Sequence, residues 1–235
     1  MIVLLMTVAL NQTPCADAEA LIMAAGERVA LLDVQGAAAR LTSRRACEDV
    51  AVAYWYLRGL TAAREAYRYG GSPESLEPVK LAIDELASSS SQTRAAEIAR
   101  IVLMAASAAA QSEREEMGLL LDHAIALERQ QRAAGLPGAP LLTAQEVAGD
   151  LWLQVHRFDE ALRAYRDASE QVGPTRRTTL GLARTAFRVG DLAGACREYR
   201  VFVQGWPPAA GAPAELEEAR TFLERPQCGK PAQTP

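Results

Sequence analysis

This chain of 235 residues lacks a basic excess and long apolar runs, and histidines are scarce. Its formal net charge is −4 and it has only two histidines, whereas a protein that coats nucleic acid usually carries a basic excess. No apolar run reaches the roughly 18–20 residues that are needed to cross a bilayer. We therefore expect no nucleic-acid partner and no spanning membrane segment.

The motifs of the common catalytic and cofactor sites are missing too. The sequence has no glycine-rich phosphate loop, no GxSxG and no HExxH. His123 and His156 lack the spacing of metal ligands, and there is no CxxC pair. We expect no catalytic residue, no metal and no cofactor, and thus a function in binding rather than chemistry.

The composition that is present favours a globular, helical protein. Apolar residues make up 49% of the chain and charged residues 23%, which are globular values. Alanine is abundant and β-branched residues are sparse, which favours helix. Clusters of glycine, proline and serine divide the helical periodicity into about ten segments. The expected helices cover 17–39 (with Gly26 as a candidate break), 43–69, 74–88, 92–110, 112–134, 141–155, 158–172, 175–189, 191–204 and 213–224.

The N-terminus resembles a secretory signal. Residues 2–10 are apolar, and polar and small residues follow up to Ala18, as in an h-region and its cleavage site. Neither Lys nor Arg precedes the apolar run, so a first buried helical turn is the alternative. Cys15 invites comparison with a lipoprotein, but Gln12-Thr13-Pro14 is a poor lipobox. We expect residues 1–18 to be a signal peptide.

Four cysteines, Cys15, Cys47, Cys196 and Cys228, allow three disulfide pairings. Pairing within each terminal quarter of the chain is the simplest. Helices 191–204 and 213–224 are joined by a short proline-rich turn, so they should run antiparallel and bring Cys228 back to Cys196. The alternative is four free thiols in a cytosolic protein, because disulfides persist in oxidising compartments.

The second half of the chain repeats itself after 34 residues. Residues 142–175 match 176–209 in aromatic, small and proline positions. The matched pairs include Phe158 with Leu192, Ala161 with Ala195, Tyr165 with Tyr199, and Pro174 with Pro208.

This pattern resembles the tetratricopeptide repeat (TPR) family over about 141–209. The family places a small residue where two helices cross, then an aromatic after the turn, Ala-x-x-x-aromatic and a proline. The first copy has Gly149, Phe158, Ala161, Tyr165 and Pro174 in that order. The second copy departs from the pattern, because Ala186 replaces an aromatic and Phe202 stands where a small residue is usual.

The resemblance implies an all-α fold, a right-handed superhelical stack of antiparallel helix pairs. Residues 141–225 would form two repeats and a capping helix. Residues 19–136 would form degenerate helical hairpins, in which no 34-residue spacing holds. Residues 226–235 would be a loose tail unless Cys228 pins it.

A group of arginines is the sharpest candidate for a binding site. Arg177, Arg184 and Arg188 are spaced by seven and four residues, so they share one helical face. In the family this helix lines a concave groove, to which the preceding pair would contribute Asp150 and Gln154. Three guanidiniums could hold carboxylates of a partner. An ordinary solvated face is the alternative.

Aromatic residues crowd another expected helix. Tyr54, Trp55, Tyr56, Tyr67 and Tyr69 lie within 43–69, and either core packing or an exposed binding patch explains them.

These features favour a non-enzymatic scaffold or assembly factor of a bacterial cell envelope, in the periplasm or otherwise outside the cytoplasm. It would bind a protein or peptide partner with acidic groups. A cytosolic TPR adaptor or co-chaperone is the alternative. An all-helical enzyme centred on Asp122 and His123 is a weaker one.

Overall fold

The computed structural model describes residues 15, 17–42, 47–90, 93–207 and 211–229. This part of the chain folds into eleven α-helices without a strand, as the composition predicts. The helices are α1 (Ala18–Ala30), α2 (Val34–Leu41), α3 (Glu48–Arg68), α4 (Pro73–Ser90), α5 (Arg94–Ala110), α6 (Arg114–Ala133), α7 (Ala144–Gln154), α8 (Phe158–Val172), α9 (Arg176–Arg188), α10 (Leu192–Gln204) and α11 (Ala214–Leu223).

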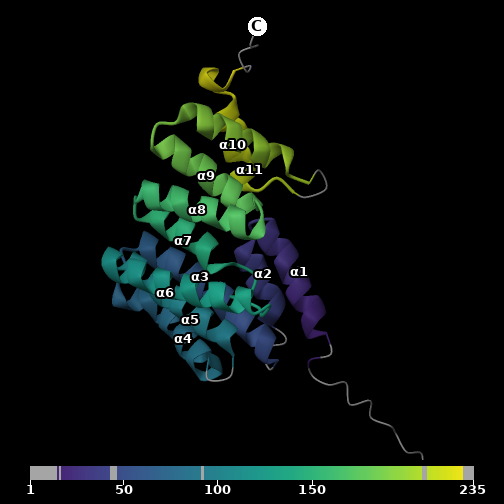
Figure 1. Cartoon of the computed structure of the whole chain (residues 1–235), viewed down its shortest axis with the longest axis vertical. Coiled ribbons are helices and arrows are strands. Elements are labelled where there is room, and N and C mark those ends of the chain that lie inside the picture. The colour runs from purple at the N-terminus through teal and green to yellow at the C-terminus, as the bar shows by residue number, and fades with distance from the viewer. Residues whose placement is uncertain (1–14, 16, 43–46, 91–92, 208–210, 230–235) are drawn as a thin grey trace, which may run out of the picture.

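Consecutive helices pack as pairs. Helix α3 packs on α4, α5 on α6, α7 on α8 and α9 on α10, and α11 packs on α10. The first helices of successive pairs also touch, α3 with α5, α5 with α7 and α7 with α9. Figure 1 shows the result as an elongated stack in which α9, α10 and α11 form the upper end. Short connections between packed neighbours place the two helices of a pair antiparallel.

The starts of α7 and α9 are fixed by side-chain caps. Thr143 accepts from the Glu146 N–H, and the Glu146 carboxylate accepts from the Thr143 N–H, both at 3.1 Å. Thr175 and Thr178 form the same reciprocal pair at the start of α9. Thr175 also donates to Glu146 at 2.9 Å, which ties the caps of α7 and α9 together. Such caps satisfy N–H groups that have no partner within the helix.

The N-terminal segment breaks at a different place from the one expected. Gly26 lies inside α1, and the break is at Leu31–Asp33, where Leu32 has a φ of 64°. The Asp33 carboxylate accepts from the Gly36 N–H at 2.8 Å and so starts α2. A glycine inside a helix costs only about 1 kcal/mol, so the capping aspartate decides the boundary.

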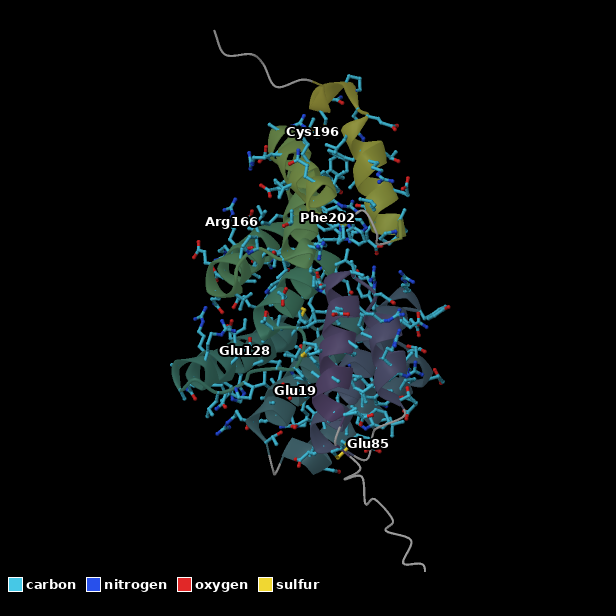
Figure 2. The ribbon with its side chains drawn as sticks, turned by 90° about the vertical axis from the view of Figure 1, so that its right-hand side faces the viewer. Glu19, Glu85, Glu128, Arg166, Cys196 and Phe202 are labelled. Atoms are coloured by element: carbon cyan, nitrogen blue, oxygen red, sulfur yellow. A yellow bond between two sulfur atoms is a disulfide. The ribbon has the colours of Figure 1, made fainter. Side chains whose placement is uncertain are left out.

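The core forms two clusters. The larger runs from α1 to α8 and is rich in alanine, with Tyr56 and Leu57 fully buried in α3. The smaller is built by α9, α10, α11 and Cys228. Cys196 and Phe202 belong to the smaller cluster, and Figure 2 shows them in the upper part of the stack, above Glu128. Ala161 and Ala195 are both fully buried, as the repeat predicts.

The ring of Tyr165 lies between two glycines. A Cβ on Gly149 of α7 would sit 2.5 Å from ring atoms Cδ1 and Cε1, and a Cβ on Gly181 of α9 would overlap Cζ and Cε1. Tyr165 itself is 1% exposed. The two glycines therefore let α7 and α9 close on the aromatic residue of α8.

Both local disulfides are formed. Cys15 pairs with Cys47 and Cys196 with Cys228, at Cα separations of 5.5 and 5.4 Å. The second bond is the one predicted to pin the tail, and Pro226–Cys228 form a 3-10 turn held against α10. Residues 230–235 of that tail, and most of the expected signal peptide 1–18, lie outside the described residues.

The end of α1 reaches the C-terminal cluster. Leu31 and Leu32 pack against it, and Arg176 donates to the carbonyls of Ala30 at 3.2 Å and Gly205 at 3.1 Å. Segments from the two ends of the chain are therefore joined. None of the helices described is long and apolar enough to cross a membrane.

Candidate functional site

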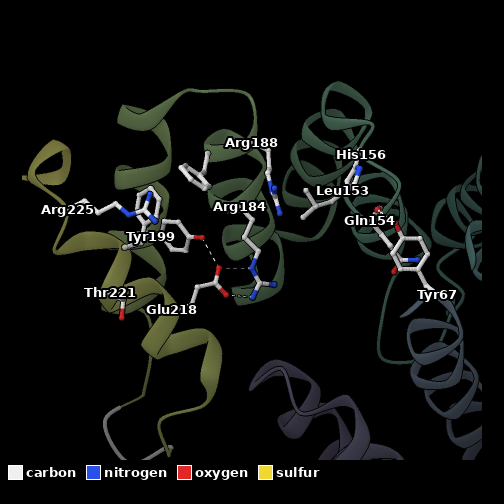
Figure 3. A pocket seen from close by; sticks show the side chains of 12 residues that line it. Tyr67, Leu153, Gln154, His156, Arg184, Arg188, Tyr199, Glu218, Thr221 and Arg225 are labelled. Atoms are coloured by element: carbon white, nitrogen blue, oxygen red, sulfur yellow. Dashed lines mark hydrogen bonds and ion pairs between the residues drawn. The ribbon is translucent and has the colours of Figure 1, made fainter. Parts of the chain in front are cut away.

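An open pocket of about 650 Å³ lies at the C-terminal ends of three helices (Figure 3). Helices α7, α9 and α11 supply most of its walls, and α3 and α10 add one tyrosine each. The lining residues are Tyr67, Leu153, Gln154, His156, Arg184, Phe187, Arg188, Tyr199, Glu218, Thr221, Phe222 and Arg225. The pocket thus combines aromatic walls with three guanidinium groups.

Tyr67 closes the pocket on the α3 side. Its hydroxyl donates to the Gln154 carbonyl at 2.8 Å, so the end of α3 is fixed to the end of α7. Figure 3 shows Tyr67, Gln154 and His156 together, opposite Tyr199 and Arg225. His156 has a φ of 62°, which places it in the tight turn between α7 and α8.

Arg184 is bound internally on the floor of the pocket. It donates twice to Glu218 of α11, from Nε at 2.9 Å and from Nη2 at 2.5 Å. The Tyr199 hydroxyl donates to the same carboxylate at 2.8 Å. This Arg–Glu–Tyr group joins α9, α10 and α11.

Ionisation of the group follows from its environment. Burial opposes the charge on Glu218, but hydrogen bonds from Arg184 and Tyr199 outweigh it and hold the pKa of Glu218 below its ordinary value. Burial, and then the bond to Glu218, raise the pKa of Tyr199. Glu218 is therefore an anion at neutral pH and neutralises Arg184.

A second group of the same composition lies one repeat earlier. The Tyr165 hydroxyl donates to Asp150 at 2.6 Å, and Arg177 forms an ion pair with Asp150. Asp150, Arg184 and Glu218 are successive positions 34 residues apart, as are Tyr165 and Tyr199. An arginine–carboxylate–tyrosine contact is thus found at two successive junctions between helix pairs, and its tyrosines, unlike its charged residues, occupy equivalent repeat positions.

The clamp of three free arginines needs correction. Arg177 and Asp150 pair with each other and do not line the pocket, and Arg184 is neutralised by Glu218. Gln154 and Arg188 do line it. Within the described ranges Arg188 forms no ion pair, so it is the one arginine of the predicted set without a carboxylate partner.

Several lining residues escaped the sequence analysis. The repeat could have identified Glu218, since this residue follows Arg184 by the repeat length of 34 residues. No sequence pattern indicated that Phe187 and Phe222 share one surface. In the structure Phe187 is 37% exposed and Phe222 is 5% exposed. Arg225 follows the end of α11, where no repeat position predicts it. Its guanidinium lies 5.0 Å from the centre of the Phe187 ring and 4.5 Å from that of Phe222.

The aromatic residues of α3 divide between core and site. Tyr56 is fully buried and donates to the Leu142 carbonyl at 3.2 Å, whereas Tyr69 is 76% exposed. Only Tyr67 reaches the pocket.

A buried carboxylate holds the linker before α7. Glu128 is 3% exposed and accepts from the backbone N–H groups of Ala139 at 3.1 Å and Ala144 at 2.9 Å. Burial raises the pKa of Glu128. Both bonds are to backbone, so Glu128 has a structural role that fixes where α7 begins.

Removing the charge of Glu218 gives a prediction about pH. A lowered carboxyl pKa stabilises the fold at pH values above the pKa of the unfolded state, near 4.5. That stability is lost as the pH falls through the lower pKa of the folded state. Glu218→Gln should cost about 1 kcal/mol at pH 7, since solvent screens this half-exposed group. Urea unfolding at pH 7 and pH 3 measures it, and the difference from wild type should shrink at pH 3.

Glu217→Gln is the matched control on the same helix. Its surface pair with Arg220 is exposed on both sides, so the change should leave the free energy of unfolding near that of wild type at both pH values. An equal loss of unfolding free energy in both variants would mean that the negative charge of α11, and not the contact with Arg184, contributes to stability.

The residues described contain no group of three histidine, cysteine or acidic side chains placed to hold a metal ion. In comparisons with known proteins, no family model, no curated protein and no solved structure matches the chain.

Proposed function

We propose that this protein is a non-enzymatic scaffold or assembly factor that binds a segment of a partner protein in the pocket beside Arg188. In this proposal the helix pairs form a right-handed TPR-like superhelix, and the pocket is part of its concave groove. Support comes from the contacts between first helices of successive pairs and from the buried tyrosines Tyr165 and Tyr199, which are 34 residues apart and each donate to a carboxylate.

The observation that carries the proposal is an unpaired guanidinium in an open pocket with aromatic walls. Arg188 lines the pocket beside Phe187 and Leu153, and no carboxylate of the described chain pairs with it. An acidic group of a partner would supply the missing charge through a strong hydrogen bond. The rings and Leu153 offer apolar area for a neighbouring side chain.

We further propose that the protein works outside the cytoplasm of a bacterium. The Cys196–Cys228 disulfide suits an oxidising compartment, and it persists whether or not residues 1–18, which include Cys15, are removed. The signal-like composition of residues 1–18 supports the same location. A cytosolic adaptor of the same fold would keep its thiols reduced.

Selection from a phage-displayed library of random heptapeptides tests the binding site. The peptides retained by the oxidised protein should contain Asp or Glu beside an apolar residue. A fluorescent copy of the most enriched peptide should bind Arg188→Ala about tenfold more weakly, which corresponds to about 1.4 kcal/mol. Its affinity should also fall with salt.

Arg166→Ala is the control variant. Arg166 is an exposed arginine on α8 that does not line the pocket, and Figure 2 shows it on the side of the molecule away from α11. If no peptide is enriched, or if both arginine variants bind like wild type, the proposed site is wrong.

A further inference from the structure

A second, smaller cavity lies directly beyond one wall of the pocket. It has a volume of about 260 Å³, and Phe187, Phe222 and Arg225 line both cavities. Its other walls come from Leu192, Gln227 and the Cys196–Cys228 disulfide. Phe187, Phe222 and Arg225, which line both cavities, form the divide between the two spaces.

Arg225 lies on this divide without an acidic partner. Its guanidinium stacks on the Phe187 and Phe222 rings and, in the part of the chain that is described, makes no ion pair. The backbone on its C-terminal side is held in place, because Cys228 is bonded to Cys196 and its carbonyl accepts from Arg200. Arg225 is therefore a positioned cation on an aromatic surface.

The rim of the smaller cavity is apolar and open. Phe187 and Leu192 are each 37% exposed, and Val189 in the turn between them is 44% exposed. Exposed apolar residues that are scattered singly need no explanation, but a cluster beside a cavity marks an interaction site. The surface thus offers an apolar recess next to a positive charge.

The sizes of the two cavities indicate how they divide a ligand. Small-molecule pockets measure about 300–1,000 Å³, a range that includes the larger cavity at about 650 Å³ but not the smaller at about 260 Å³. The smaller cavity accordingly suits one side chain of a ligand whose remainder lies in the larger one.

We propose that the two cavities form one continuous site, in which a partner segment places an apolar side chain against Leu192 and the disulfide and an acidic side chain on Arg225. This rests on the proposed function, since it extends the groove beyond Arg188 and assigns the chemistry of the bound segment. The partner is an extended stretch of polypeptide that carries at least two acidic groups, one for each unpaired arginine, and an aromatic or large aliphatic anchor.

Binding of the enriched fluorescent heptapeptide, measured by anisotropy with the oxidised full chain, tests this extension. Leu192→Gln and Arg225→Ala should each weaken binding about tenfold. Leu192 opens α10 and is partly exposed, so this substitution spares the core. Leu119→Gln, at a position on α6 that is 73% exposed, is the matched control and should bind like wild type.

Replacement of the peptide anchor distinguishes the two cavities. Changing the apolar residue of the peptide to Ala should weaken binding to wild type but have little further effect on Leu192→Gln, because the two changes remove the same contact. If Arg188→Ala weakens binding while Leu192→Gln and Arg225→Ala do not, the extension is overturned and the proposed function stands. If none of the three variants weakens binding, both fail.

Discussion

Replacing Gly181 with alanine is expected to destabilise the protein by about 1–3 kcal/mol, although alanine favours helix. The new methyl group would overlap the Tyr165 ring. That ring cannot retreat, because Gly149 of α7 contacts it from the other side and its hydroxyl is bonded to Asp150. Thermal unfolding followed by circular dichroism would show the lower midpoint.

Gly26→Ala is the matched control for helix propensity. Gly26 also lies inside a helix, but a Cβ there would meet only Leu141 at 3.5 Å, an ordinary contact. This variant should gain about 0.5–1 kcal/mol. Opposite signs for the two variants would confirm the contact with Tyr165, whereas a stabilised Gly181→Ala would contradict the packing of α7, α8 and α9 around the ring.

Removing the Cys196–Cys228 bond should destabilise the protein more than Gly181→Ala does. The double variant Cys196→Ala with Cys228→Ala opens a loop with a sequence separation of 32, for which the chain-entropy estimate is about 3–4 kcal/mol. It also frees the turn that holds Arg225 beside the pocket. Urea unfolding should shift to lower concentration, and binding of the peptide should weaken at the same time.

The other disulfide provides a control of equal loop length. Cys15 and Cys47 are also separated by 32 residues, so the entropic loss on their replacement should be similar. These residues do not line the pocket, and peptide affinity should stay near that of wild type under conditions where both variants are folded. Equal loss of affinity in the two variants would contradict a specific role for the C-terminal bond.

Local patterns predicted the helices of the second half well. Residues 158–172 are helical as expected, because Gly173 and Pro174 end that segment. The 34-residue spacing also predicted burial of Ala161 and Ala195, since equivalent positions meet equivalent neighbours. Residues 141–143 are not helical, because Thr143 caps α7 and Glu128 binds the backbone before it.

The site was only partly predictable, because charge pairing depends on distant helices. Spacing placed Arg184 and Arg188 on one face, but the pairing of Arg184 alone follows from the position of α11, which carries Glu218. Arg225 lies beyond the last helix and is positioned by a disulfide rather than by helical periodicity. Helix periodicity does not describe such contacts, which form only when separate helices pack against one another.

The bridge made by Arg176 has a consequence for how the protein unfolds. In an open stack each repeat touches only its neighbours, so unfolding can begin at one end and spread. Here Arg176 binds the Ala30 carbonyl 146 residues away, and Leu31 and Leu32 cover the C-terminal cluster. This contact couples terminal fraying to the opposite end of the chain, and protection of α9 and α10 amides against hydrogen exchange should therefore depend on whether α1 is in place.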